Sequence, residues 1–397
     1  MKLLVVGHSY ITAFAQSKYA AMKQLHSELQ LRLVMPHAVR HVFKTYKPEI
    51  HPRLEPLEVV SLPTIFNQSH MTRILHPARF AALLKGFDPD HIHIEEDPHS
   101  LVGVETVFLA RQMCRCATIS FFIWDNLLRR PRFPLNVIKR TLTRYSFARC
   151  ELVVCGNSEA QRLLREDKCY MGHSLVLPQV GLDPDEYTAP LPPKLLEQLG
   201  KSDDTPLIGF LGRLVPEKGI GLLLEALSRL QTLKWKLLLV GNGPMKEEIR
   251  TDWQNRFGER LLCLDAIPHK AVSHYLRALD IFVFPSYGIP TWKEQFGLTL
   301  AQAMMSGVAC IGSSSGAIPD VLGANGLIFK EKDLDGLTCA LKKVLESEAL
   351  RSELGDKARA FALQRYSKSA VASAYLAAFE NMASSIKNEA RNYSKVG

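Results

Sequence analysis

The sequence lacks a paired-cysteine motif and a long apolar segment. Its eight cysteines are scattered, and the only close pair, Cys114 and Cys116, does not have the CxxC spacing of zinc and thioredoxin-like sites. No uncharged apolar run reaches the roughly 18 residues of a membrane-spanning helix, and residues 1–7 are too short for the core of a signal peptide. We therefore expect reduced core thiols in an intracellular, cytoplasmic protein.

Several functional motifs are also missing. The turn after the first expected strand, Gly7-His8-Ser9-Tyr10, has no GxGxxG pattern, which argues against a Rossmann dehydrogenase. A glycan phosphorylase would need a much longer chain with a pyridoxal-binding lysine region. No aromatic stacking platform or nucleic-acid-binding module is recognisable, so we expect no nucleic-acid partner.

The composition is that of a globular protein with two domains. The chain has 397 residues, 47% of them hydrophobic and 22% charged, and this length favours two cores over one. Its formal net charge is +9, which makes anionic partners plausible but does not choose between nucleotides, nucleic acid and lipid headgroups.

Short apolar runs, separated by segments with helical spacing, recur in both halves of the chain and predict parallel sheets covered by helices. The expected strands are residues 3–6, 92–94, 118–123, 152–155, 207–211, 236–240, 281–284 and 308–311. The pattern breaks in the proline-rich residues 177–205. We therefore predict domains at residues 1–180 and 181–365, both doubly wound and Rossmann-like.

The final segment, residues 366–397, is expected to be an amphipathic helix with a tail. Apolar residues recur there at steps of four, four and three, namely Val371, Tyr375, Phe379 and Met382. This spacing predicts a helix that packs back on the body of the protein.

The second half carries two glycine-containing turns after expected strands. Gly212 and Gly219 allow close approach of the backbone to a ligand, and Arg213 and Lys218 bring two cations to the carboxyl end of a parallel strand. This arrangement suits a diphosphate, although a turn with solvated charges would have the same sequence. The second turn, residues 241–244, contains Asn242 and is a weaker signal.

Residues 284–319 form the most informative stretch. A helix expected to begin near Phe296 would present free N–H groups, including those of Gly297 and Leu298, to a phosphate. Glu294 stands at this mouth, where its carboxylate can accept hydrogen bonds from sugar hydroxyls, and Gln302 can point to the same crevice. The alternative is that Glu294 is a helix N-terminal acid and Gln302 a surface residue.

These motifs, in order, resemble the retaining family 4 glycosyltransferases of GT-B fold, of the type that acts in bacterial polysaccharide or glycolipid assembly. The resemblance rests on Gly-Arg-Leu-x-Pro-Glu-Lys-Gly, Val-Gly-Asn-Gly-Pro, Glu-Gln-Phe-Gly and Ser-Gly-x-x-Pro-Asp, and covers most of residues 207–366. It implies two Rossmann-like domains facing across a cleft, with a UDP- or GDP-type nucleotide sugar bound to the second domain as substrate and no cofactor or metal.

The resemblance also implies roles for individual residues. Arg213 and Lys218 would neutralise the diphosphate in place of a metal ion, and Glu294 would hold the transferred sugar. The amides of residues 296–298 would bind phosphate or sugar, and Ala266 and Ile267 would meet the nucleotide base through their backbone. Gln302 replaces a glutamate that normally engages the ribose, so we expect weakened donor binding.

The first half resembles the family less closely. His8 is either a polar contact in the crevice or a capping or core histidine, and Glu96 follows a strand, where it would contact acceptor hydroxyls unless the loop is merely solvated. Trp124, followed by Asp125, occupies a position where many relatives carry a histidine near the reacting carbon. We assign these four residues to the acceptor side.

Residues 129–149 carry seven basic residues and no acid, interleaved with apolar residues. Such a segment suits an anionic membrane surface at the inner face of the membrane, or else a solvated helix face. We therefore expect a metal-independent, retaining hexosyltransferase that acts on a glycan or lipid-linked acceptor. The alternative is a catalytically degenerate, nucleotide-sugar-binding scaffold of a polysaccharide assembly complex, suggested by Gln302 and Trp124.

Overall fold

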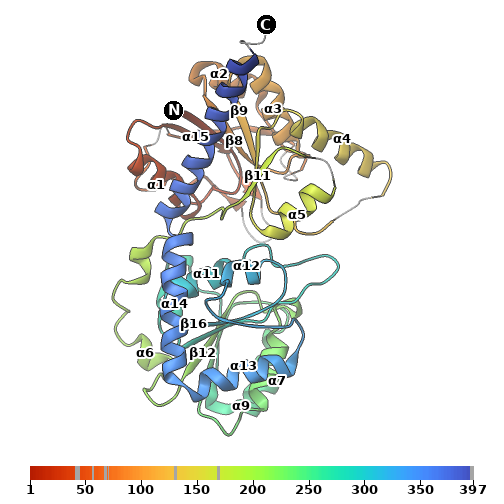
Figure 1. Ribbon diagram of the computed structural model, residues 1–397. Coiled ribbons are helices and arrows are strands. Elements are labelled where there is room, and N and C mark those ends of the chain that lie inside the picture. The colour runs from red at the N-terminus through yellow and green to blue at the C-terminus, as the bar shows by residue number, and fades with distance from the viewer. Residues whose placement is uncertain are drawn as a thin grey trace. The chain divides into compact units, whose positions relative to one another are not determined.

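The computed structural model describes residues 1–40, 45–55, 58–66, 69, 71–128, 132–167 and 170–393. The chain forms two compact units (Figure 1). The N-terminal unit comprises Met1–Gly181 together with Lys368–Gly397, and the C-terminal unit comprises Leu182–Ser367. The sequence analysis placed the first boundary at residue 180 and treated the tail as separate, whereas the tail belongs to the N-terminal unit.

The N-terminal unit contains a seven-stranded parallel sheet in the order β11-β10-β9-β8-β1-β2-β5. Its strands are β1 (Lys2–Gly7), β2 (Gln30–Pro36), β5 (Val59–Leu62), β8 (His91–Glu95), β9 (Thr118–Ile123), β10 (Leu152–Cys155) and β11 (His173–Val176). Two small antiparallel pairs accompany it: β3 (Val39–Arg40) with β4 (Thr45–Tyr46), and β6 (Thr64–Ile65) with β7 (Ile74–Leu75).

The helices of this unit cover the sheet and bury its apolar strands. They are α1 (Ser17–Leu25), α2 (Pro77–Phe87), α3 (Leu101–Met113), α4 (Leu135–Phe147), α5 (Ser158–Glu166) and α15 (Lys368–Tyr393). As expected from the apolar spacing, α15 packs on the body of the protein. It lies along α1, and Val371, Tyr375, Phe379 and Met382 are buried in the core (Figure 1).

The C-terminal unit contains a six-stranded parallel sheet in the order β14-β13-β12-β15-β16-β17. Its strands are β12 (Leu207–Leu211), β13 (Lys236–Val240), β14 (Leu261–Leu264), β15 (Ile281–Phe284), β16 (Ala309–Ser313) and β17 (Leu327–Phe329). Its helices are α6 (Leu195–Gln198), α7 (Ile220–Ser228), α8 (Lys246–Glu248), α9 (Gln254–Phe257), α10 (Val272–Arg277), α11 (Leu298–Met305), α12 (Ile318–Leu322), α13 (Leu334–Glu346) and α14 (Glu348–Tyr366).

In each sheet the direction in which successive strands are added reverses once. In the N-terminal unit, β2 and β5 lie on one side of β1, and the later strands, from β8 onward, lie on its other side. In the C-terminal unit, β13 and β14 lie on one side of β12, and β15 and the later strands lie on its other side. Doubly wound sheets bind ligands at the carboxyl ends of the strands at such a switch point. This topology confirms the prediction of two doubly wound, Rossmann-like α/β units.

Residues 246–257 form one continuous helical path, in which a π-helical turn, Ile249–Trp253, joins α8 to α9. Two expectations about local structure were wrong. The helix expected from Phe296 begins at Leu298, because Gly297 has a φ of +83° and interrupts the helical path. Among the described cysteines, Cys116 and Cys339 are exposed and not core thiols.

Candidate functional site

Two of the donor-site residues predicted from sequence, Lys218 and Glu294, meet at the switch point of the C-terminal sheet. The loop after β12 runs through Gly212 and Arg213 to a short 3-10 turn, Pro216–Lys218, and then to Gly219, which has a φ of +73°. A Cβ atom on Gly219 would lie 2.0 Å from the carbonyl oxygen of Pro285, just after β15. Glycine at this position therefore lets the loops after β12 and β15 touch.

Lys218 and Glu294 form an ion pair at the centre of this arrangement. The Lys218 Nζ atom lies 2.6 Å from Glu294 Oε2, and the two side chains are only 12% and 11% exposed. The ammonium group also lies 4.6 Å from the centre of the Trp292 ring, a distance at which cation–π attraction operates. A cation and a carboxylate are thus held side by side in partly desolvated surroundings, where charges act more strongly than in water.

The loop after β16 fixes the backbone of Glu294. Ala317 N donates a hydrogen bond of 3.0 Å to the Glu294 carbonyl oxygen. Gly316, with a φ of +54°, passes so close that a Cβ atom there would lie 2.3 Å from the same oxygen. The Ser-Gly-x-x-Pro-Asp motif therefore positions Glu294.

Four other predicted donor residues lie in the loops after β12, β13 and β14 of the same sheet. Arg213 is exposed, and its neighbour Leu214 donates a hydrogen bond of 2.9 Å to the Asn242 carbonyl oxygen, which ties the loops after β12 and β13 together. Asn242 is exposed and accepts a 2.8 Å hydrogen bond from Lys246 at its side-chain oxygen. Ala266 and Ile267 follow β14, the outermost strand on that side.

The predicted donor residues at the start of α11 are half-buried or buried. Phe296 and Leu298 are half-buried, and Gly297 between them is buried. Gln302, one helical turn further on, is 3% exposed, so it is not a surface residue. The side chain of Gln302 lies near the Tyr187 hydroxyl, whose pKa is raised by burial. Whether Gln302 reaches a ribose stays a prediction.

At the switch point of the N-terminal sheet, His8 follows β1 and Glu96 follows β8. The His8 Nδ1 atom lies 2.7 Å from Glu96 Oε1, and Glu96 is 4% exposed, so the loop is not a solvated acidic one. The negative charge of Glu96 raises the pKa of His8 against the opposing effect of burial. This corner can present a histidine N–H group to a ligand.

Sequence reasoning missed the neighbouring residue, Glu95, which is the hub of a buried polar cluster. Lys18 Nζ lies 2.6 Å from Glu95 Oε1, and the Ser9 hydroxyl donates a 2.5 Å hydrogen bond to Oε2. Tyr19 also donates to this carboxylate. Burial by itself would raise the pKa of Glu95, but the charge of Lys18 lowers it overall. The signal available in the sequence was a lysine directly before the apolar residues 19–22, with which it is buried in the structure.

This cluster extends to Trp124. The Trp124 Nε1 atom donates a 2.8 Å hydrogen bond to Gln179, and the Gln179 amide nitrogen donates another of 2.8 Å to Glu95. The indole ring packs edge-on against Phe122. Trp124 and its neighbour Asp125 thus stand on a rigid base at the carboxyl end of β9.

The described part of the chain has neither a metal-binding cluster nor a membrane-spanning helix. No group of three or more His, Cys, Asp or Glu side chains in the described ranges is placed to hold a metal ion. None of the described helices combines the length and the apolar character needed to cross a membrane.

The fold and the site together define a class of protein. The chain superposes on the crystal structure of Anabaena HepE in complex with UDP with a TM-score of 0.69 and 17% identity, covering 96% of this chain and 100% of that one. The sucrose-phosphate synthase of Thermosynechococcus elongatus gives the same TM-score at 15% identity, with 97% and 100% covered. These likenesses establish the two-unit GT-B architecture.

The sequence comparison is more specific. Residues 193–361 match the family of glycosyl transferases group 1, which confirms the resemblance to family 4 glycosyltransferases indicated by the motifs. Relatives include the GDP-mannose-dependent alpha-mannosyltransferase of Mycolicibacterium smegmatis, 26% identical over 72% of each chain.

A second relative is similar over a shorter stretch. The GDP-mannose-dependent monoacylated alpha-(1-6)-phosphatidylinositol monomannoside mannosyltransferase of Corynebacterium glutamicum is 30% identical over 41% of this chain. The matched part spans 44% of that relative.

Proposed function

We propose that the protein is a retaining glycosyltransferase that transfers a hexose from a UDP- or GDP-sugar to a glycan or lipid-linked acceptor. The observation that carries this proposal is the Lys218–Glu294 pair, 2.6 Å apart at the switch point of the C-terminal sheet. The group 1 domain over residues 193–361 supports it, as do relatives named as GDP-mannose-dependent and a structural neighbour solved with UDP.

In the proposed mechanism the protein supplies position and charge. Lys218 and Arg213 neutralise the donor diphosphate, and Glu294 accepts hydrogen bonds from hydroxyls of the transferred sugar. The bond between the anomeric carbon and the diphosphate oxygen breaks while the acceptor oxygen bonds to the same face of the sugar. The acceptor proton passes to the departing diphosphate, so that no enzymic base is required.

The first experiment measures release of the nucleoside diphosphate from a panel of UDP-, GDP- and ADP-sugars, with and without a membrane-lipid extract. Release from one donor, accelerated by the extract, supports a transferase and names the donor. Binding without release contradicts the proposed activity, and absence of binding contradicts the donor site. Anomeric NMR of the product tests retention, and turnover in excess EDTA tests independence from metal.

We also propose that the enzyme works at the inner, cytoplasmic face of a membrane, bound through α4. This helix and the residues before it expose Phe133, Leu135, Val137 and Ile138 together with Arg132, Arg140 and Arg144, and α4 contains no acid. Arg129 and Arg130 of the predicted basic segment lie outside the described residues. Each basic residue near anionic lipid contributes on the order of 1 kcal/mol.

Vesicle sedimentation tests this attachment. Binding to vesicles with about 30% anionic lipid, and loss of that binding at high salt, are expected for an electrostatically held helix. A double substitution, Phe133→Ser with Ile138→Ser, should weaken binding. Equal binding to neutral vesicles would contradict the proposal.

A further inference from the structure

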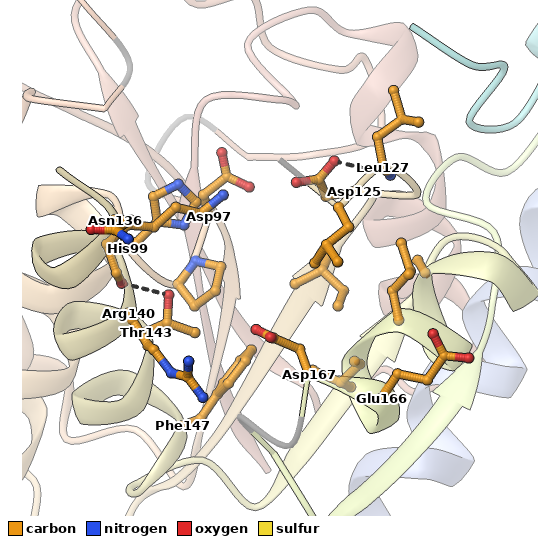
Figure 2. A pocket seen from close by; sticks show the side chains of 17 residues that line it. Asp97, His99, Asp125, Leu127, Asn136, Arg140, Thr143, Phe147, Glu166 and Asp167 are labelled. Carbon is orange, nitrogen blue, oxygen red and sulfur yellow. Dashed lines mark hydrogen bonds between the residues drawn. The ribbon is translucent and has the colours of Figure 1, made fainter. Parts of the chain in front are cut away.

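Two features that the motifs did not indicate lie in different units. The N-terminal unit contains a cavity of about 500 Å³, lined by α4, by α5 and by the loops after β8 and β9 (Figure 2). Asp125, already assigned to the acceptor side, is part of its lining, so this cavity belongs to the acceptor region already proposed. The second feature lies in the C-terminal unit, in the loop of residues 287–293 that follows β15.

The 287–293 loop folds into a tight turn. Pro290 and Thr291 occupy its two central positions, between Ile289 and Trp292. Proline fixes the φ angle that the second residue of the common β-turns requires. Ile289 N donates a 2.9 Å hydrogen bond to the Trp292 carbonyl oxygen, and Trp292 N returns one of 3.1 Å to Ile289. The turn therefore fixes the backbone of Trp292.

Backbone hydrogen bonds also anchor this loop to its neighbours. Tyr287 N donates a 2.9 Å hydrogen bond to the carbonyl oxygen of Glu217, the residue directly before Lys218. Gly288 N donates one of 2.9 Å to Glu331 Oε2, after β17, and this bond is the main reason why the pKa of Glu331 is lowered. The loops after β12 and β15 are thus tied together one residue away from the lysine.

The ammonium group of Lys218 lies against a carboxylate and two aromatic rings. Its Nζ atom is 2.6 Å from Glu294 Oε2, 4.6 Å from the centre of the Trp292 ring and 5.1 Å from that of Phe284. Phe284 ends β15 and is 3% exposed, so its ring is firmly held. These three partners lie within residues 284–294, so one short segment positions the ammonium group.

The carboxylate and the rings act differently on this ammonium group. The Glu294 carboxylate balances its charge, and in the proposed mechanism it also accepts hydrogen bonds from the sugar. An aromatic face attracts a cation through its quadrupole but carries no net charge. The rings therefore restrain the flexible lysine stem, which would otherwise lose side-chain entropy on binding a phosphate, and leave its positive charge available.

We infer that Trp292 is a positioning residue of the donor site: its indole ring holds the Lys218 ammonium group where the donor diphosphate binds. The inference rests on the proposed function and adds a residue that none of the motifs named. A charge that is already in place costs no reorganisation when its ligand arrives, so loss of the ring should weaken binding of a nucleoside diphosphate.

Calorimetry with the full chain, without acceptor, tests this role. UDP, GDP and ADP are compared, and the nucleotide that binds most tightly is used for the variants. Trp292→Leu should weaken its binding about 5- to 30-fold, the factor that a partly desolvated cation–π contact corresponds to. Trp292→Phe keeps an aromatic face and should weaken binding by less than about threefold.

Trp253→Leu is the matched control. The Trp253 ring belongs to the same unit and also has a cation near it, with the Arg256 guanidinium 5.1 Å from the ring centre. Trp253 is not part of the proposed site, so its substitution should leave the affinity for the nucleotide unchanged. Melting temperatures show that each variant folds. A loss in Trp292→Phe as large as that in Trp292→Leu overturns the inference.

A double-mutant cycle separates positioning of the lysine from a general loss of loop structure. In a Lys218→Met background the ring has no ammonium group to hold, so Trp292→Leu should change the affinity by less than about twofold. An equal loss in both backgrounds overturns the inference, because Trp292 would then act without the lysine.

Fluorine NMR of protein labelled with fluorotryptophan tests the contact without any ligand. The chain has four tryptophans, and the resonance missing from Trp292→Phe belongs to Trp292. Lys218→Met should shift this resonance, whereas Lys234→Met, at an exposed position of the same unit, should not. A Trp292 resonance that is the same with and without the Lys218 ammonium group overturns the inference.

The outcomes separate this inference from the proposed function. If the wild type binds a nucleoside diphosphate and Trp292→Leu binds it equally well, the donor site stands and only the role of Trp292 falls. If the wild type binds none of the three nucleotides, the proposed donor site is contradicted and the inference falls with it.

Discussion

Lys218 Nζ lies 2.6 Å from Glu294 Oε2, although the two residues are 76 positions apart in the sequence. One follows β12 and the other follows β15, and these strands are neighbours in the sheet. In the proposed mechanism, this pair places a charge for the diphosphate beside a hydrogen-bond acceptor for the sugar. Each charge also keeps the other compensated when no substrate is bound.

Loss of the Lys218 charge should lower turnover about 100- to 1,000-fold, as removal of a preorganised electrostatic contact does in other enzymes. The measurement is the steady-state kcat of Lys218→Ala with the identified donor. Lys234→Ala is the matched control, because Lys234 pairs with Asp204 on an exposed surface of the same unit. A folded Lys218→Ala protein with the wild-type rate would contradict the donor-site assignment.

Substitution of Gly316 should disturb Glu294 through its backbone. In Gly316→Ala the new Cβ atom would lie 2.3 Å from the Glu294 carbonyl oxygen. We therefore expect kcat/KM for the donor to fall at least tenfold. Gly258→Ala separates strain from contact, since Gly258 has a similar φ of +58° but no atom within 4 Å of such a Cβ. Gly258→Ala should lower the melting temperature and leave kcat/KM unchanged. An equal loss of kcat/KM in Gly258→Ala and Gly316→Ala would contradict the argument from the Glu294 contact.

Removal of the buried lysine should destabilise the N-terminal unit. Lys18→Met leaves Glu95 buried without its cation, which typically costs about 3–5 kcal/mol. The double variant Lys18→Met with Glu95→Leu should regain much of that stability, because no charge is then left uncompensated. Arg162→Met, in an exposed pair with Glu166, should change the free energy of unfolding by roughly 0.5 kcal/mol or less. Urea unfolding measures all three, and a Lys18→Met effect as small as that of Arg162→Met would contradict the account of the cluster.

The His8–Glu96 pair predicts a pH-dependent stability. The charge of Glu96 raises the pKa of His8, burial and Arg73 oppose this rise, and Asp97 supports it. A raised folded-state pKa gives stability that is present below the unfolded value of about 6.5 and is lost as the pH rises through the folded value. Wild type should therefore exceed His8→Asn in stability by about 1 kcal/mol near pH 6 and by less near pH 9. Urea unfolding at both pH values measures this, and a difference that grows with pH would contradict the pairing.

Some of the site was open to prediction because its signals are local. The glycines at 212, 219, 297 and 316 mark turns after strands, and the parallel alternation of strands and helices implies that such turns meet at one edge of a sheet. Gly219 and Gly316 indeed make contacts that a side chain would prevent. Lys218 and Glu294 could therefore be named without coordinates, although their contact could not.

Other features depend on partners that no local pattern identifies. Glu95 and Glu96 are adjacent and chemically alike, yet Glu95 is held by Lys18 and Gln179 while Glu96 faces His8. Glu95 ends β8 and Glu96 directly follows it. Successive side chains of an extended chain point to opposite sides, so one carboxylate is buried in the structure while its neighbour can contact a substrate. From the sequence only Glu96 could be named, because the division between the two glutamates depends on these distant partners.

The sequence by itself determined that the chain folds as two parallel α/β units and named the residues of the proposed donor site in the second, since hydrophobic periodicity and glycine turns act over a few residues. Only the tertiary structure decided that the final helix returns to the N-terminal unit, that Glu95 is a buried hub, and that four segments enclose a cavity beside Asp97 and Asp125. These features arise from packing between residues far apart in the chain, and packing depends on the shape and burial of all the partners at once.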